Sequence, residues 1–584
     1  MESGPRGFLV PLLYSEIFDK VPTRDDLLLE LRKVDWRTIV MQVVGILCVS
    51  WQDGVEDGEH QTRLVIAMVK DLPYRNAIAK FLQNQAHRRL FTREALVGML
   101  RVAVVEGSAG NGNIDDQADA FTKGALIVNE LLAAEIMLEE ATNKPSDLMP
   151  TELRSAVLQL ENPHDLIGRS DAFFVWAQTE RAKGLNTYLD IAKDLERFTG
   201  LTPLEFLAGA YFTFARYSSM VNWDEVERLG VAFSITQWQA GMADTRVIRR
   251  WIAANEVPLE TLRLEWAAEK SLSFAALGSV WTKPVVRVEH DLFFVPVPAL
   301  VGNMLNDGLY FTLFDGYADE ARNDKEARRR AISRFTGFFG AFFEDHIAGT
   351  FEKAYKDKPG RRFSREKRYD EGGLSTDIVI AEGNDVIFVE VVSKRMTLRD
   401  SVLGLKPAAI DKDIEDGVMH KAHQIDDNIC KFRNRDLLPS WPRPEGQRFF
   451  PIVVAPQDRP RINIITTDVA EAQAKARESG GFLEGAEPLE LLDLGEIEQL
   501  ENGLVAGVSL TMLLANKNNS GPGHRLMSLH NYLIYVEPDF LPPGMSPARQ
   551  RGSDVAKAIM ELAQTWQTGP ASDAANGEGA AGSS

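Results

Sequence analysis

The chain has 584 residues, with 65 lysines and arginines against 84 aspartates and glutamates, and a formal net charge of −19. Its hydrophobic content of 45% is ordinary for a globular protein, so most of the chain should fold into about two to four domains. Two cysteines, Cys48 and Cys430, exclude a disulfide framework and a cysteine-rich zinc module. The acidic balance excludes a wholly basic nucleic-acid coat, but a local basic site is compatible with it.

No segment approaches the roughly 18 continuous apolar residues that a membrane span requires, so no membrane partner is expected. The apolar start at 7–14 is short and lacks a cleavage site, which argues against a signal peptide. A cytoplasmic protein with reduced cysteines is the resulting expectation.

Residues 1–275 are predicted to form a mainly helical domain of unknown role. Apolar residues recur at three- and four-residue spacing in four stretches, 76–105, 117–141, 171–198 and 203–220. The glycine-rich stretch 107–112 resembles a phosphate loop after a strand, but no Lys-Ser/Thr follows it. Asp115 and Asp116 would also repel phosphate, so a plain loop between helices is favoured.

Residues 276–330 are predicted to hold short strands and a linking helix. The strands fall within 285–295 around a polar turn, and the helix within 299–330. A C-terminal segment is assigned to 516–568. The Ala/Gly/Ser-rich end, 569–584, has the composition of a disordered tail.

Residues 331–515 carry the most informative pattern. A helix is predicted over 334–356, three strands over 361–369, 375–380 and 386–394, a helix over 411–432 and a strand over 449–455. The segments 489–492 and 494–514 are interpreted as an extension. The fold class is therefore multidomain, with a large helical N-terminal half followed by an α-β-β-β-α-β core.

The two middle strands allow their register to be predicted. With a two-residue turn at Gly383-Asn384, facing residues have numbers that sum to 767. Asp377 and Glu390 meet this condition, so their Cβ atoms should lie about 5 Å apart on one face of the sheet. Two buried carboxylates repel each other, and a shared divalent cation would relieve the repulsion.

Mg²⁺ fits such oxygen ligands, with Mn²⁺ as an alternative. Asp377 and Glu390 are thus the predicted metal ligands. Two other interpretations stay open: one carboxylate is protonated or paired with Arg or Lys, or the register slips by one residue and separates the pair.

The element order, with Asp377 followed thirteen residues later by Glu390 in an apolar strand, resembles the PD-(D/E)XK, or restriction-endonuclease-like, nuclease superfamily. The resemblance covers about 120 residues, 334–456, and Glu344 in the preceding helix matches an acidic residue that many members carry. It implies a metal-dependent nuclease. The usual lysine two residues after the second acid is absent, because Val392 stands there.

Two lysines are candidates to replace it. Lys394 lies on the same strand face as Glu390, about 7 Å beyond the usual place. Lys421 lies within the apolar stripe of helix 411–432 and should point at the sheet, and the resemblance makes such a displaced lysine plausible. The alternatives are a charge at a strand end for Lys394 and an extended side chain reaching water for Lys421.

Local charge favours a phosphate-bearing partner. Residues 322–368 hold 14 basic and seven acidic residues, a net +7, which leaves −26 elsewhere. The alternative is that Arg328–Arg330 form a solvated helix face. The expected nucleic-acid-binding residues are Arg361, Arg362, Arg365, Lys367, Arg368 and Gln424. His420 and His423 are expected to be solvated rather than metal ligands.

The resulting hypothesis is a Mg²⁺-dependent endonuclease acting on DNA, with RNA as the alternative substrate. Its catalytic residues would be Asp377, Glu390, Lys394, Lys421 and Glu344. By analogy with nuclease cores fused to large modules, a role in bacterial defence against foreign DNA is suggested, with the helical half contacting a protein partner or a second copy. The rival hypothesis is a catalytically degenerate core in a helical scaffold or sensor that binds nucleic acid or a protein.

Overall fold

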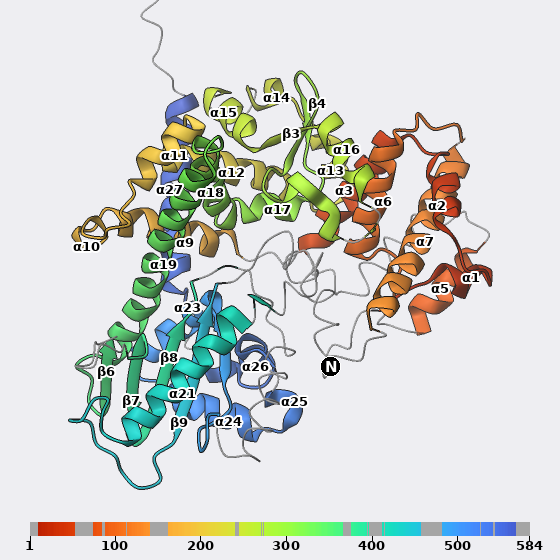
Figure 1. Ribbon diagram of the computed structural model, residues 1–584. Helices are drawn as coiled ribbons and strands as arrows, with labels where there is room; N and C mark the ends of the chain where they lie inside the picture. Colours follow the sequence, from red (N-terminus) through yellow and green to blue (C-terminus); the bar gives the residue numbers. More distant parts are fainter. Residues whose placement is uncertain are drawn as a thin grey trace, which may run out of the picture.

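The structure of the protein is a computed structural model. It describes residues 10–52, 74–84, 88–112, 114–140, 162–239, 245–269, 271–272, 274–365, 375–393, 395, 412–413, 415–456, 482–525, 527–540 and 544–567. The chain is mainly helical, with a mixed sheet in its C-terminal half (Figure 1). The predicted tail 569–584 lies outside the described residues.

The first half is built from helices, as predicted. Thr202 shows how the sequence starts them: its hydroxyl accepts from the Glu205 N–H, Glu205 caps in return, and Pro203 occupies the first helical position. The helices are α1 (Tyr14–Phe18), α2 (Arg24–Leu31), α3 (Trp36–Gln52), α5 (Arg75–Asn84), α6 (Arg93–Glu106), α7 (Ile114–Glu140), α9 (Pro163–Ala177), α10 (Glu180–Lys183), α11 (Ile191–Thr199), α12 (Pro203–Ser218), α13 (Trp223–Leu229), α14 (Ile235–Gln239), α15 (Thr245–Asn255) and α16 (Leu259–Ala268).

The glycine-rich stretch is a loop between helices, which confirms the prediction. Residues 102–105 belong to α6 rather than to a strand, and Gly107 ends that helix in the left-handed conformation with φ +59°. A short parallel pair, β1 (Val10–Pro11) and β2 (Arg88–Arg89), lies elsewhere in this half.

The predicted strands near 285–295 are also present. β4 (Val285–Glu289) and β5 (Leu292–Phe294) form an antiparallel pair, and β3 (Glu256–Pro258) joins it in parallel. β3 was not predicted because three residues give no readable alternation. The single linking helix expected over 299–330 is instead divided into α17 (Pro298–Asn303), α18 (Asp307–Glu320) and the start of α19, after the 3-10 turn Phe274–Trp281.

Helix α19 (Lys325–Tyr355) connects the helical half to the sheet (Figure 1). It starts nine residues before the predicted helix, because Asp324 caps it by accepting from the Glu326 and Ala327 N–H groups. Its phenylalanines belong to one hydrophobic core that also contains the helical half and one face of the sheet. The expected domain boundary at 330/331 therefore falls inside a continuous helix.

The C-terminal sheet has five strands in the order β10-β9-β8-β7-β6. Pairs β6–β7 and β7–β8 are antiparallel, whereas β8–β9 and β9–β10 are parallel. The strands are β6 (Arg361–Arg365), β7 (Ile378–Glu382), β8 (Asp385–Val391), β9 (Phe449–Ala455) and β10 (Glu490–Asp493). The predicted α-β-β-β-α-β order is present, although β8 ends earlier than expected and β7 starts later, after Asp377. The expected strand residues 366–369 lie outside the described residues.

The predicted hairpin register is confirmed. Ile378 faces Val389, Val379 faces Phe388 and Glu382 faces Asp385, and each pair sums to 767. Gly383 has φ +58° at the first loop position, as a type II′ turn requires. The alternative register, slipped by one residue, is therefore excluded.

The second face of the sheet is covered by α21 (His420–Arg433), which follows a π-helical turn, Glu415–Met419. A separate hydrophobic cluster fills this layer, with Val379, Phe388 and Val392 from the strands against Ile425 and Ile429 from the helix. The expected extension is present as β10, α23 (Leu494–Val505) and α24 (Leu510–Asn519), with α25 (Pro522–Arg525), α26 (Leu529–Tyr535) and the 3-10 turn Pro538–Phe540 following.

The last described helix, α27 (Pro547–Gln567), packs against α9 in the helical half (Figure 1). The contact is close because two glycines meet there. A Cβ atom on Gly168 would lie 2.0 Å from the carbonyl oxygen of Ala548, and one on Gly552 would lie 1.7 Å from that of His164. The segment 516–568 is thus not one separate unit, since its last helix completes the N-terminal half.

Candidate functional site

The candidate site lies where Asp377 and Glu390 approach each other on the α21 face of the sheet. Asp377 directly precedes β7, and its Oδ2 accepts a hydrogen bond of 2.7 Å from the Val391 N–H. Glu390, near the end of β8, has 2% of its surface exposed. The register therefore places both carboxylates together, as the sequence predicts.

Lys421 reaches this pair from α21. Its Nζ lies 2.6 Å from Glu390 Oε2 and 3.6 Å from Asp377 Oδ2, so one ammonium group contacts both carboxylates. Its side chain is 24% exposed. The helix directs Lys421 toward the sheet because its buried neighbours Ala422 and Ile425 pack in the layer between the helix and the strands. The solvent-directed alternative for Lys421 is therefore wrong.

The site contains two carboxyl groups, and only the single positive charge of Lys421 contacts them. Burial and the charge of Asp377 together raise the pKa of Glu390 to about 8, despite the opposing attraction of Lys421. Burial would lower the pKa of Lys421, but the charges of Asp377 and Glu390 outweigh it and raise that pKa. An additional positive charge would therefore stabilise the ionised form of Glu390.

The oxygen donors and this excess of negative charge fit a hard divalent cation. Mg²⁺ is commonly held by one or two carboxylates and keeps several waters. Within the described part of the chain, no group of three or more His, Cys, Asp or Glu residues forms a metal centre. Asp377 and Glu390 would thus supply the direct protein ligands, with water completing the coordination.

The other predicted catalytic residues have different positions. Glu344 is exposed on α19, close enough for its charge to raise the pKa of Lys421. The middle of α19 passes close to the chain just after β8: a Cβ on Gly340 would lie 2.8 Å from Ser393 Oγ. Lys394 lies outside the described residues. Val392, at the position of the usual lysine, is buried in the cluster beneath α21.

Two predicted phosphate-binding arginines have structural partners instead. Arg361 donates to three backbone carbonyls, those of Ala354, Leu504 and Val508, and its guanidinium lies over the Tyr355 ring. Arg365 pairs with two carboxylates of α19, at 2.5 Å from Asp345 and 2.7 Å from Glu352. Both residues thus join β6 to its neighbours, and their assignment as nucleic-acid ligands stays a prediction.

The remaining nucleic-acid candidates divide by position. Arg362 is exposed on β6, while Lys367 and Arg368 lie outside the described residues. Gln424 lies one turn after Lys421, with its Nε2 3.3 Å from His420 Nε2. His420 and His423 are exposed, as expected.

The basic run Arg328–Arg330 is exposed near the start of α19. Arg329 pairs with Glu326 at 2.8 Å, as in a solvated helix face. Fifteen residues of helix separate Arg329 from Glu344, a distance of about 22 Å along the axis at 1.5 Å per residue. The net +7 of 322–368 is therefore distributed along α19 and β6 and is not gathered at the carboxylates.

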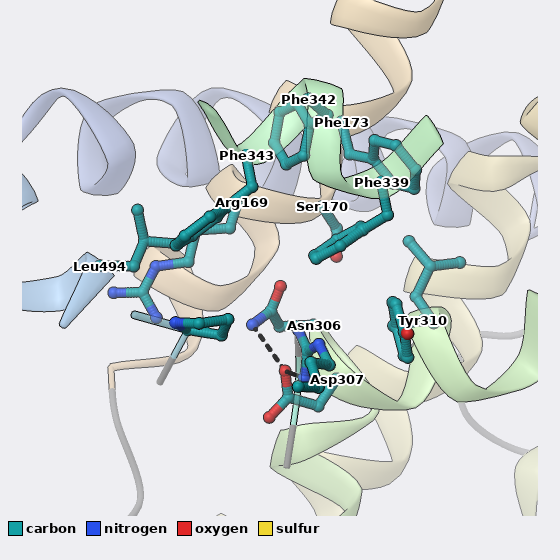
Figure 2. A pocket seen from close by; sticks show the side chains of 13 residues that line it. Arg169, Ser170, Phe173, Asn306, Asp307, Tyr310, Phe339, Phe342, Phe343 and Leu494 are labelled. Carbon is teal, nitrogen blue, oxygen red and sulfur yellow. Dashed lines mark hydrogen bonds and ion pairs between the residues drawn. The ribbon is translucent and has the colours of Figure 1, made fainter. Parts of the chain in front are cut away.

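A small cavity lies where the helical half meets the ends of the parallel strands (Figure 2). Phe173, Phe339 and Phe342 line one side, and Asn306 and Asp307 the other. Its volume of about 30 Å³ can hold about one or two water molecules. The cavity belongs to a junction that sequence reasoning missed.

Two ion pairs close this junction, one partly exposed and one buried. Arg395, four residues after β8, pairs with Asp307 of α18 at 2.8 Å and lies over the Tyr310 and Phe339 rings. Arg169 of α9 pairs with Glu498 of α23 at 2.7 Å. Nothing in the sequence near Arg169 identifies a partner 329 residues away. Arg395 could have been noticed because it directly follows the candidate Lys394.

Comparisons with protein-family models, curated proteins and solved structures find no match to this chain. In the described part of the chain, no helix has both the length and the apolar character needed to cross a membrane. The case for a function therefore depends on the geometry of the site.

Proposed function

We propose that this chain is a metal-dependent nuclease that hydrolyses phosphodiester bonds of DNA, with a restriction-endonuclease-like core. The observation that carries the proposal is the convergence of Asp377, Glu390 and Lys421. Asp377, just before β7, and Glu390 of β8 form a carboxylate pair, and α21 provides the lysine that β8 lacks. These are the charge types that phosphodiester hydrolysis requires.

Each residue has a defined part in this proposal. Asp377 and Glu390 would hold Mg²⁺, or Mn²⁺ in its place, and the bound ion would supply an activated water and stabilise charge on the phosphate. Lys421 would neutralise the scissile phosphate or orient the attacking water. Glu344 is near enough to contribute through charge. Arg362 and Gln424 are the described candidates for contacting the nucleic-acid backbone.

The direct test is cleavage of plasmid, linear and single-stranded DNA, and of RNA, with Mg²⁺ or Mn²⁺. Asp377→Asn and Glu390→Gln should each reduce the rate by at least about 100-fold if they hold the metal. Lys421→Met should reduce it by about 100- to 1,000-fold. Asp427→Asn, an exposed carboxylate on the same helix, is the matched control and should cut at the parent rate.

A catalytically degenerate core is the second candidate, and two observations favour it. Val392 replaces the usual strand lysine, and the ammonium of Lys421 directly contacts the carboxylate that would bind metal. Such a protein would bind nucleic acid or a protein without cutting. Failure to cleave any substrate with either metal, together with DNA binding that Arg362→Ala weakens, would favour this candidate over the nuclease.

The helical half is proposed to recognise a protein partner, a second copy or a DNA structure, in a role such as defence against foreign DNA. Its attachment supports such coupling, because α19 is continuous between the halves and both Arg169 and Arg395 join them through ion pairs. Cleavage by the full chain alone gives the intrinsic activity, against which the effect of an added partner can then be measured.

A further inference from the structure

The position of the Lys421 ammonium bears on how the carboxylates acquire a metal ion. It lies 2.6 Å from Glu390 Oε2 and 3.6 Å from Asp377 Oδ2. Asp377 Oδ2 also accepts the Val391 N–H, which fixes the direction of that carboxylate. The ammonium therefore occupies the space between two oxygens that a shared cation would also use.

We propose that Lys421 is an intrinsic counter-ion that stabilises the carboxylate pair in the metal-free protein and competes with a divalent cation for it. This inference rests on the proposed function, because it takes Asp377 and Glu390 as the metal ligands. It goes beyond a catalytic role for Lys421, since it makes the lysine a regulator of metal loading. A residue that only assisted the reaction would not oppose metal binding.

Electrostatics makes the two occupants compete. A divalent ion coordinates carboxylate oxygens at about 2.0–2.6 Å. An ammonium group hydrogen-bonded to the same oxygen would then lie only a few ångströms from it. At such separations in a mostly buried site, their mutual repulsion is well above thermal energy. The ammonium must therefore leave Glu390 when the ion binds.

The lysine also has the freedom to leave. Its side chain is 24% exposed, whereas Glu390 has 2% of its surface exposed and is fixed in β8. A lysine stem is a flexible four-carbon chain, so the ammonium can move toward solvent while the helix stays in place. Glu390 has no comparable path to solvent, because it is almost fully buried and its backbone is paired with Val453 of β9.

The test measures Mn²⁺ binding to the full chain by calorimetry, without nucleic acid, in the parent and in Lys421→Met and Lys421→Gln. Coupling between two competing ligands is commonly about 5- to 150-fold. Both variants should bind Mn²⁺ at least about fivefold more tightly than the parent. Lys421→Arg, which keeps the charge, should bind close to the parent. Lys431→Met, ten residues later on the same helix, controls for loss of a lysine.

Thermal unfolding provides a second measurement. In chelator, Lys421→Met should melt below the parent, because the negative charge of the Asp377–Glu390 pair then lacks its counter-ion. Saturating Mn²⁺ should raise its melting temperature by more than that of the parent. A variant that failed to fold would show no cooperative transition, and Lys421→Gln would then decide the comparison.

The outcomes separate this inference from the proposed function. Unchanged or weaker Mn²⁺ binding in the Lys421 variants, with binding still abolished by Glu390→Gln, would overturn the inference and leave the metal site intact. Binding absent from every variant, or unaffected by Glu390→Gln, would overturn both. Binding in Lys421→Met but not in the parent would support the inference and favour the degenerate core.

Discussion

Substituting Glu390 with glutamine should change how stability depends on pH. Burial and the charge of Asp377 raise the pKa of Glu390 to about 8. Between the ordinary pKa of a glutamate, about 4.3, and this value, the unfolded chain is ionised while the folded protein keeps its proton. The stability that Glu390 contributes is therefore fully present below about pH 4.3 and is lost as the pH rises through about 8.

The size of this loss follows from the same values. One pKa unit corresponds to about 1.4 kcal/mol, so the loss across the window is of the order of 4 kcal/mol. A glutamine side chain is neutral at every pH, so Glu390→Gln should gain stability relative to the parent by about this amount between pH 5 and pH 8.5. Most of the gain should appear above pH 5, where the unfolded parent is ionised.

Urea unfolding at half-unit pH steps, with chelator present, measures this difference. Asp377→Asn is the informative companion, because removing the neighbouring charge should lower the pKa of Glu390 and reduce the pH dependence. A parent that instead became more stable relative to Glu390→Gln as the pH rose would refute the reasoning. Glu390 would then ionise more readily in the folded protein than in the unfolded chain.

Three further predictions concern the framework around the site. Arg362→Ala should weaken DNA binding and reduce its salt dependence by about one phosphate contact. Arg365→Ala should instead mainly lower the melting temperature. Equal losses of DNA affinity in the two variants would contradict the structural role of Arg365. Gly552→Ala should destabilise the protein by about 1–3 kcal/mol in urea unfolding, because the added methyl group would meet the backbone of α9. An unchanged urea midpoint would mean that α9 and α27 can move apart at little cost. Arg169→Met should lower the free energy of unfolding by about 3–5 kcal/mol, because Glu498 keeps its charge in a buried position. Adding Glu498→Gln to this variant should recover part of the lost stability. No recovery would show that the loss comes from packing.

The hairpin was predictable because its determinants are local. A two-residue turn and the alternation of side chains along a strand fix which residues face each other, and Gly383 supplies the backbone conformation that the turn needs. The position of Lys421 followed from helical spacing alone, although the π-helical turn before it was not predicted. Both features depend on residues close to each other along the chain, or on one helix.

The partners of the arginines were not predictable in the same way. Arg361 and Arg365 read as free positive charges in the sequence, but their partners come from α19 and from residues 504–508. Composition counts a charge whether or not another segment neutralises it. The packing of α27 on α9 was equally unpredictable, since Gly168 and Gly552 are far apart in the sequence and nothing in either segment indicates that the two helices meet.

The layers of the fold explain why position 392 holds no lysine. Val392 lies in the cluster between sheet and helix, on the same strand face as Glu390, so a lysine there would have to enter that apolar layer. Lys421 enters from the helix that bounds the layer, and its side chain is still 24% exposed. The ammonium charge thus reaches Glu390 from the helix, on a side chain that is partly exposed to solvent. A helix-borne lysine can move away without disturbing the strand that holds the carboxylate, whereas one on the strand itself would be tied to the paired backbone. The valine at 392 therefore does not by itself indicate a lost activity, because Lys421 supplies a positive charge to the same two carboxylates.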